Sequence, residues 1–386
     1  MEQLKTLEAA PPEYPPAKAP SHPVLSTGTL GLRRGVPSVL DAGRVVHTVS
    51  GRMALALALE RLGIGRGARV LLPGYHCTAI VEPLVHAGAV PVFYAVRRDL
   101  SVDLDDLARK ADGARALLAI HYFGFPQNMT PLRAFCDARG IALIEDCAHA
   151  FFGHVGAKGD VAIASTWKFF AVQEGGCLIV RGEAKGLRGP GLRYEAKSMV
   201  NALERSWEMG RLPVLRAVLW PLFALKDRLR DRRAAPARGT DVPTGGHEFD
   251  ESWVGRRPSR FTRFVLALSN CRRIARRRRE NYAFLLEGLR GLPGTRALFP
   301  ALPEGVVPYV FPLLVEDERV FPRLKRSGVP IVRFGELLWD GVDDPVALEY
   351  SRTVLQFPCH QEMTRKELTW IVAQVRDAAV RQGDPR

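Results

Sequence analysis

Residues 141–176 read IALIEDCAHAFFGHVGAKGDVAIASTWKFFAVQEGG, and this stretch decides the fold that the sequence predicts. It begins with the apolar run 141–144, which is typical of a buried strand and leads directly into Glu145 and Asp146. In open α/β sheets, ligands bind at the carboxyl ends of the strands. We therefore expect the carboxylate of Asp146 to lie where a ligand would bind.

Apolar strands and amphipathic helices alternate on both sides of this stretch. Such alternation is typical of a mostly parallel sheet that is covered by helices on both faces. The sequence therefore predicts an α/β domain. We expect strands at 69–73, 90–96, 116–124, 161–165 and 176–180, and helices at 53–62, 81–89, 104–111 and 129–140.

Composition divides the chain further. Residues 1–45 are rich in proline, glycine and alanine, so we expect a mobile leader without chemistry. Residues 46–292 form the predicted large domain, which an arginine-rich insertion at 183–256 interrupts. Residues 293–386 read as strand, helix, strand and closing helix, which predicts a smaller C-terminal α+β domain.

The overall composition limits the class of protein. Of the 386 residues, 47% are hydrophobic, which permits a full core and excludes disorder throughout. No apolar run approaches the roughly 20 residues of a membrane-spanning helix. The N-terminus lacks the basic start and apolar centre of a signal peptide, so we expect a cytoplasmic protein. The six cysteines and nine histidines show no metal-ligand spacing, so we expect neither disulfides nor a metal site.

The formal net charge of +14 admits anionic ligands, anionic lipid and nucleic acid as partners. The apolar segment 212–225 has basic flanks and could lie flat on a membrane, although we favour packing on its own domain or on a partner subunit. The region 261–292 contains the run Arg276–Arg279, which at first suggests nucleic acid. Because apolar residues recur there at helical spacing, we expect instead a long amphipathic helix with a solvated basic face, and no nucleic acid partner.

The opening stretch has the side chains that pyridoxal phosphate (PLP) needs. This cofactor accepts electrons itself, so the protein only positions and tunes it. Lys168 would bond to it, provided that the surroundings disfavour the charged ammonium. Asp146 would hold the pyridine nitrogen protonated, and His149 would hydrogen-bond the ring or its phenolic oxygen. The phosphate would bind at a helix start and at the hydroxyl of the Ser-x-x-Lys sequence, which gives Ser50, Gly51, Arg52 and Ser165.

Each of these signals is weak alone. Ser-x-x-Lys also occurs in serine acyl-transferases, an isolated Lys168 would ordinarily be a solvated surface residue, and Asp146 alone could cap a turn. Their occurrence in this order, each at a strand end or helix start, favours the cofactor site.

Several segments resemble the DegT/DnrJ/EryC1/StrS aminotransferases, a family of sugar aminotransferases with the aspartate aminotransferase fold. The resemblance covers residues 45–182 and resumes more loosely from 257, where TVLQFPCHQEMTRKEL resembles the closing motif of the family. It implies a fold type I, PLP-dependent transferase-like large domain. The segments are SGRMALALALERLGIGRGARVLLPGY, HYFGFPQNM, GIALIEDCAHAFFG, GDVAIASTWKFF and EGG.

The resemblance implies roles for individual residues. Lys168 would be the Schiff-base lysine, Asp146 the partner of the pyridine nitrogen and Ser165 a phosphate ligand. His149 would be the family's Gln or His near the ring oxygen. Arg52 follows Gly51 where the family usually has Gly-Thr at the phosphate.

Other positions depart from the family. Cys77 falls where an aromatic residue stacks on the cofactor ring. An asparagine that reaches the phosphate of the partner subunit has no clear match, and Ser259 or Arg260 is the nearest candidate. We expect substrate specificity from residues outside the opening stretch, namely Tyr75, His76, Arg333 and His360.

The resemblance implies a homodimeric aminotransferase with a shared site. An amino donor, glutamate by likeness, would convert PLP to pyridoxamine phosphate (PMP). The amine would then pass to a keto sugar, nucleotide-linked by likeness, in surface polysaccharide or secondary-metabolite biosynthesis. Two alternatives stay open: a PMP-dependent sugar dehydratase of the same family, which typically has His in place of Lys168, and a catalytically silent basic scaffold at the membrane surface. A nucleic-acid binder ranks third.

Overall fold

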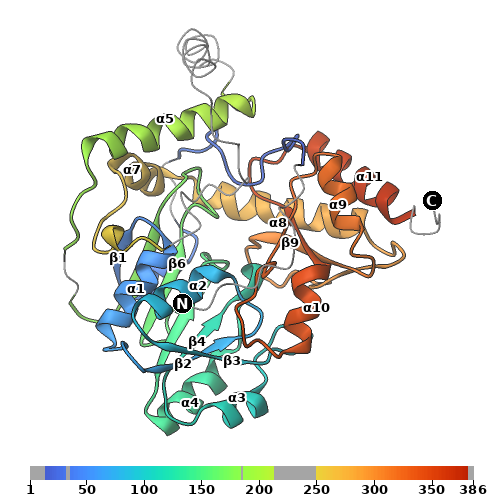
Figure 1. Cartoon of the computed structure of the whole chain (residues 1–386). Coiled ribbons are helices and arrows are strands. Elements are labelled where there is room, and N and C mark those ends of the chain that lie inside the picture. The colour runs from blue at the N-terminus through green and yellow to red at the C-terminus, as the bar shows by residue number, and fades with distance from the viewer. Residues whose placement is uncertain (1–13, 32–34, 184–185, 213–248, 381–386) are drawn as a thin grey trace.

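The computed structural model describes residues 14–31, 35–183, 186–212 and 249–380 (Figure 1). Its larger sheet has seven strands in the order β1-β7-β6-β5-β4-β2-β3. Five neighbouring strands of this sheet, β6, β5, β4, β2 and β3, run parallel, whereas β7 is antiparallel to both of its neighbours. The predicted mostly parallel sheet is confirmed. Its strands are β1 (Arg44–Thr48), β2 (Arg69–Pro73), β3 (Val90–Tyr94), β4 (Ala114–Ile120), β5 (Ala142–Asp146), β6 (Val161–Ser165) and β7 (Gly176–Val180).

Four helices accompany the first strands. They are α1 (Gly51–Arg61), α2 (Thr78–His86), α3 (Leu104–Lys110) and α4 (Met129–Arg139). Helix α1 packs on β6, β7 and α2, while α3 and α4 lie together at the lower edge of Figure 1. Local sequence sets the ends of α4, because Asn128 accepts a hydrogen bond from the N–H of Thr130 and Gly140 adopts a left-handed φ of 63°.

The C-terminal part forms a second sheet in the order β10-β11-β9-β8, in which all pairs are antiparallel. Helix α11 packs on α9 and on α8, and α9 and α11 lie together at the right of Figure 1. The structure therefore contains the smaller α+β unit that the sequence predicts. Its elements are β8 (Thr295–Ala297), β9 (Val310–Val315), α9 (Val320–Arg326), β10 (Val332–Arg333), α10 (Pro345–Thr353), β11 (Val354–Pro358) and α11 (Arg365–Val380).

The long helix that was expected over 261–292 is two helices, α7 (Arg260–Leu268) and α8 (Cys271–Gly288). Asn270 caps α8, because its side chain accepts a hydrogen bond from the N–H of Arg273 at 3.0 Å. The N-terminal segment crosses at the break, where the N–H of Asn270 donates to the carbonyl of Thr29 at 3.0 Å. The apolar period alone does not reveal this break, because a distant segment supplies its hydrogen bonds.

The described part of the N-terminal segment packs against the rest of the chain. Ala19, Val24 and Val39 are buried, and a 3₁₀ turn, η1, covers Val39–Asp41. The N–H of Lys18 donates to the carbonyl of Gly328 at 2.9 Å, which ties the segment to the C-terminal unit. The mobility that we expect for residues 1–45 stays a prediction, and the described part of this segment is in contact with the rest of the chain.

The insertion at 183–256 contributes α5 (Leu192–Glu208) and a 3₁₀ turn, η3 (Glu251–Trp253). A third such turn, η2 (Tyr122–Gly124), follows β4. The apolar segment 212–225, which we expect to pack on its own domain or on a partner subunit, lies outside the described residues from 213 onward. Within the described ranges, no helix is long and apolar enough to cross a membrane.

Candidate active site

A cavity lies at the carboxyl ends of β5 and β6, beside the first turn of α1. The cavity is partly open to solvent. Eight residues that the sequence predicts as the cofactor site line this cavity, namely Ser50, Gly51, Arg52, Cys77, Asp146, His149, Ser165 and Lys168. Segments more than 100 residues apart in the chain therefore meet at one place.

Lys168 follows β6 and its amine lies beside aromatic rings. Its Nζ is 5.4 Å from the ring centroid of Tyr309 and 5.8 Å from that of Trp167. Burial lowers the pKa of Lys168, and Arg52 lowers it further, while Cys77 and Asp146 act in the opposite direction. A lowered pKa increases the fraction of neutral amine, which is the form that attacks a carbonyl.

Asp146 ends β5 and is buried at 4% exposure. One carboxylate oxygen, Oδ1, accepts a hydrogen bond from the N–H of Ala148 at 2.8 Å. Burial raises the pKa of Asp146, and the nearby Lys168 opposes that shift. A cation placed against this carboxylate would favour its ionised form, so Asp146 suits a protonated ring nitrogen.

The N-terminus of α1 offers an anion site. The hydroxyl of Ser50 caps this helix by accepting from the N–H of Met53 at 3.4 Å, and the neighbouring backbone amides have no partners within the helix. Strand β7 passes so close that a Cβ on Gly176 would lie 2.3 Å from the carbonyl carbon of Ser50. The glycine pair of the opening stretch therefore lets β7 pack directly against this turn.

Arg52 faces the same cavity but already has an acidic partner. Its Nε donates to Glu82 Oε2 at 2.7 Å, and both side chains are largely buried. Glu82 comes from α2 and was not among the predicted site residues. It offsets part of the positive charge that Arg52 would bring to a phosphate.

His149 presents a neutral imidazole to the cavity. Burial and then the charge of Lys168 hold the pKa of His149 well below its usual value. Its ring stacks on Tyr309 at a centroid distance of 4.9 Å and meets Phe334 edge-on at 4.9 Å. A neutral histidine can donate one hydrogen bond to, or accept one from, a ring substituent.

Two residues expected to bind substrate lie behind the cavity. Tyr75 is fully buried among the rings of Tyr122, Phe123, Phe334 and Tyr350. His76 is also fully buried; its Nδ1–H donates to the carbonyl of Gly74 at 2.8 Å, and its ring stacks on Phe93. Burial lowers the pKa of His76 to about 4. Both side chains support the fold, and neither lines the cavity.

Two further residues expected to bind substrate, Arg333 and His360, also lie outside the cavity lining. Arg333 pairs with Glu336 and stacks on Phe321. His360 is buried, and its Nε2 is 2.9 Å from the carbonyl of Pro20.

Ser259 was expected near the phosphate of a partner subunit. It is fully buried in its own chain, where its hydroxyl accepts from the N–H of Thr262 at 3.1 Å. Its N–H donates to Glu174 at 3.0 Å, so the residue organises the start of α7. In this arrangement Ser259 is not exposed toward a second subunit.

The aromatic side of the cavity was missed. Phe334 lines it, although the sequence pointed to its neighbour Arg333. Arg333 ends β10 and Phe334 lies in the turn that follows, so a shift of one residue exchanges a side chain that pairs with Glu336 for one that lines the cavity. Trp167 also lines the cavity, and its ring lies 4.7 Å from that of His22 in the N-terminal segment. Trp167 adjoins the predicted Lys168, but nothing in the sequence indicates that His22 reaches it.

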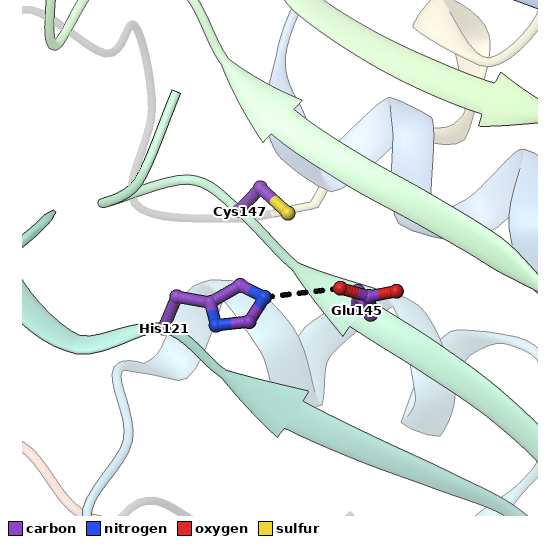
Figure 2. A group of neighbouring side chains, drawn as sticks. All are labelled: His121, Glu145 and Cys147. Carbon is purple, nitrogen blue, oxygen red and sulfur yellow. Dashed lines mark hydrogen bonds and ion pairs between the residues drawn. The ribbon is translucent and has the colours of Figure 1, made fainter. Parts of the chain in front are cut away.

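His121, Glu145 and Cys147 gather next to the predicted site (Figure 2), and their ligand-type atoms lie within 4.8 Å of one another. All three side chains are buried, and His121 Nε2 is 3.1 Å from Glu145 Oε2. Hydrogen bonds account for this cluster without an ion, because both imidazole nitrogens and both carboxylate oxygens have partners. The other donors are the backbone N–H groups of Gln127, Gly156, Lys158 and Gly159.

Comparisons with known proteins agree with this geometry. The model of the DegT/DnrJ/EryC1/StrS aminotransferase family matches residues 32–235, just over half of the chain. GDP-perosamine synthase from Vibrio cholerae is 37% identical over 142 residues, which cover 34% of this chain and 39% of the relative. L-glutamine:2-deoxy-scyllo-inosose aminotransferase from Streptomyces kanamyceticus is 35% identical over 177 residues, which cover 43% of this chain and 42% of the relative. The match therefore spans about two fifths of each relative's length.

A solved structure extends the similarity of the fold over most of the chain. The aminotransferase TlmJ from Streptoalloteichus hindustanus superposes with a TM-score of 0.61 at 23% identity. The superposition covers 88% of this chain and 86% of TlmJ.

Proposed function

Because the chain belongs to the DegT/DnrJ/EryC1/StrS aminotransferase family, which is PLP-dependent, we propose that it is an aminotransferase that transfers an amino group to a keto sugar. One observation carries the proposal: Lys168, Asp146 and the N-terminus of α1 face a single cavity. A shared fold alone would not suffice, since related folds host many reactions. Here the site has an amine, a carboxylate and an anion-binding helix start together.

The residues of the cavity fit PLP. Lys168 would bond to the cofactor, Asp146 would lie beside the pyridine nitrogen, and Ser50, Gly51 and Ser165 would bind the phosphate. When bound, PLP supplies a carbonyl that can carry the amino group and a ring that withdraws electrons from the bond that breaks. Arg52 adds positive charge, which Glu82 partly offsets.

Lys168 would also move protons. As a neutral amine it would take a proton from the carbon that carries the amino group and deliver it to the cofactor carbon within the same half-reaction, and in the second half it would move a proton in the opposite direction. Positioned acid–base catalysis of this kind contributes about 10²- to 10⁴-fold to a rate. The buried rings of His149, Phe334 and Tyr309 pack around the amine side of the cavity and limit the access of water.

The substrate and assembly are further parts of the proposal. The name of GDP-perosamine synthase concerns a nucleotide-linked sugar, and that of the second relative concerns an inosose. The net charge of +14 suits an anionic nucleotide diphosphate, so we favour a nucleotide-linked keto sugar with glutamate as the donor. We also expect a homodimer. The runner-up is the PMP-dependent dehydratase, and the presence of Lys168 in the cavity counts against it.

The test incubates the purified protein with PLP, L-glutamate and a panel of nucleotide-linked keto sugars, and follows the sugars by mass spectrometry. We expect one sugar to gain an amino group in place of its keto oxygen while glutamate becomes 2-oxoglutarate. Protein that binds PLP but forms neither an amino sugar nor 2-oxoglutarate with any member of the panel would contradict the nucleotide-sugar assignment. Inosose ketones in the same panel separate the two substrate classes.

A further inference from the structure

Arg278 is fully buried although it belongs to the run Arg276–Arg279, which was expected to form a solvated face. The side chain of Arg276, two residues earlier on α8, is 70% exposed and shows what was expected. The prediction is therefore wrong for Arg278. Its guanidinium points inward, beneath the loop that carries Lys168.

The guanidinium binds backbone carbonyls on two sides. Arg278 Nη2 donates to the carbonyl of Lys168 at 2.7 Å. Arg278 Nη1 donates to the carbonyls of Tyr309 at 2.8 Å and Pro308 at 3.1 Å. These contacts join the lysine loop of the large sheet to the segment that enters β9.

Gln361 completes the arrangement from the loop after β11. Its Oε1 accepts from Arg278 Nε at 3.1 Å, and its Nε2 donates to the carbonyl of Phe169 at 2.9 Å. The carbonyls of Lys168 and Phe169 are consecutive, so both are held by this pair of side chains. Arg278 and Gln361 together therefore restrain the backbone at Lys168 and Phe169.

The burial of this cation needs an explanation. None of the ion pairs found among the described residues includes Arg278, and the nearby Glu362 binds Arg273 at 2.6 Å. Burial lowers the pKa of Arg278 to about 10, which shows the cost of removing the charge from water. Charged side chains are rarely buried without an oppositely charged partner. At such a position, an apolar side chain would often give a fold that is at least equally stable. The hydrogen bonds of Arg278 go to the side chain of Gln361 and to three backbone carbonyls, one of which belongs to Lys168, a residue that lines the cavity.

We propose that Arg278 and Gln361 act as positioning residues, which fix the backbone of Lys168 and couple it to the C-terminal unit. The inference rests on the proposed function, since it assigns Lys168 a reactive amine. The coupling reaches the cavity itself, because Tyr309, whose carbonyl Arg278 holds, has its ring 5.4 Å from Lys168 Nζ. The contacts of Arg278 thus hold the backbone of Lys168 together with the residue whose ring lies beside its amine.

The test measures two steps separately in the full-length protein. The variants are Arg278→Met, Arg278→Lys and Gln361→Leu, with Arg276→Met as the matched control on the same helix. The affinity of the cavity for the cofactor without a covalent bond is measured with deoxypyridoxine phosphate, which has no aldehyde and cannot bond to lysine. The rate at which PLP bonds to Lys168 is then followed by its visible absorbance, and circular dichroism checks the fold of each variant.

We expect Arg278→Met to bind deoxypyridoxine phosphate as the natural protein does, while its bond to PLP forms about 10²-fold more slowly, since a shift near 1 Å has effects of that size. Arg278→Lys should recover part of the rate, and Arg276→Met should match the natural protein. An unchanged rate, or a loss of analogue affinity in step with the rate, would overturn the positioning role. If Arg278→Met does not fold, Gln361→Leu decides by the same two measurements. Failure of the natural protein to bond PLP would instead refute the proposed function.

Discussion

At the scale of single residues, the site depends on how burial changes the chemistry of Lys168 and Asp146. Burial disfavours both charged forms, so it lowers the pKa of the amine and raises that of the carboxyl group. The lowered pKa increases the neutral, nucleophilic fraction of the amine. The raised pKa means that a nearby cation would stabilise the ionised form of Asp146. A protonated ring nitrogen would supply that cation.

Replacing the amine tests its role directly. We expect Lys168→Ala to reduce amino transfer by at least about 10²- to 10⁴-fold, because the variant lacks the proton-transfer group. The measurement is the initial rate of 2-oxoglutarate formation from glutamate. Lys158→Ala is the control, because Lys158 is exposed and uses only its backbone N–H to bind Glu145. Equal losses in both variants would contradict the assignment.

The shifted pKa predicts a pH dependence. The amine must be neutral to bond to PLP, so the rate of bonding should rise with pH through the pKa of Lys168. Because that pKa is lowered, the midpoint should lie below the ordinary value of 10.5. Stopped-flow absorbance between pH 6 and 11 measures the profile. A midpoint at or above 10.5 would show that the amine is solvated rather than buried.

At the scale of elements, a hydrogen-bond network around Glu145 holds the end of β5 on the face opposite to Asp146. Side chains alternate along a strand, so Glu145 points away from Asp146 and toward His121 (Figure 2). Glu145 also accepts from the N–H groups of Gly156 and Lys158 at 3.0 and 2.6 Å. The carboxylate thus pins the loop between β5 and β6 and supports the strand that positions Asp146.

Loss of this charge should weaken the fold. We expect Glu145→Gln to lower the free energy of unfolding by about 3 kcal/mol, because the amide replaces a buried acceptor that serves several N–H donors. Urea unfolding measures the effect. Glu287→Gln, at an exposed surface pair with Arg290, should change stability little. Similar values for both variants would count against a structural role for the network.

The sequence predicts the strands around the site well because their apolar runs are local. The carboxyl ends of β5 and β6 follow from the runs 142–146 and 161–165. The parallel pairing of these two strands, which brings Asp146 close to Lys168, is a property of the whole sheet. The burial of Arg278 does not follow, because its acceptors come from residues 308–309 and 361. The break between α7 and α8 is hidden for the same reason, since residues 29–31 stabilise it.

At the scale of the whole molecule, the N-terminal segment joins the C-terminal unit through His360. This side chain is buried and its Nε2 lies 2.9 Å from the carbonyl of Pro20. Burial, with Arg278 next in effect, lowers the pKa of His360 to about 3. The folded protein therefore keeps this imidazole neutral where an unfolded chain would protonate it.

This difference predicts acid sensitivity. The folded pKa lies below the unfolded value of 6.5, so the stability contributed by neutral His360 is complete above pH 6.5 and is lost as the pH falls toward 3. Each pH unit in that window costs up to about 1.4 kcal/mol for one such group. The free energy of unfolding, measured with urea between pH 7 and 4, should fall less steeply with falling pH for His360→Gln than for the natural protein. His154 is exposed, so His154→Gln should keep the pH dependence of the natural protein. If His154→Gln reduced this dependence and His360→Gln did not, the argument would be refuted.

The central claim is that this fold brings one lysine to PLP. The most direct measurement mixes the protein with PLP, reduces it with borohydride, and locates the modified lysine by peptide mass spectrometry. We predict that the pyridoxyl group lies on Lys168, and that Lys168→Ala carries none at the site. A modification found only on other lysines, with Lys168 unmodified, would contradict the account.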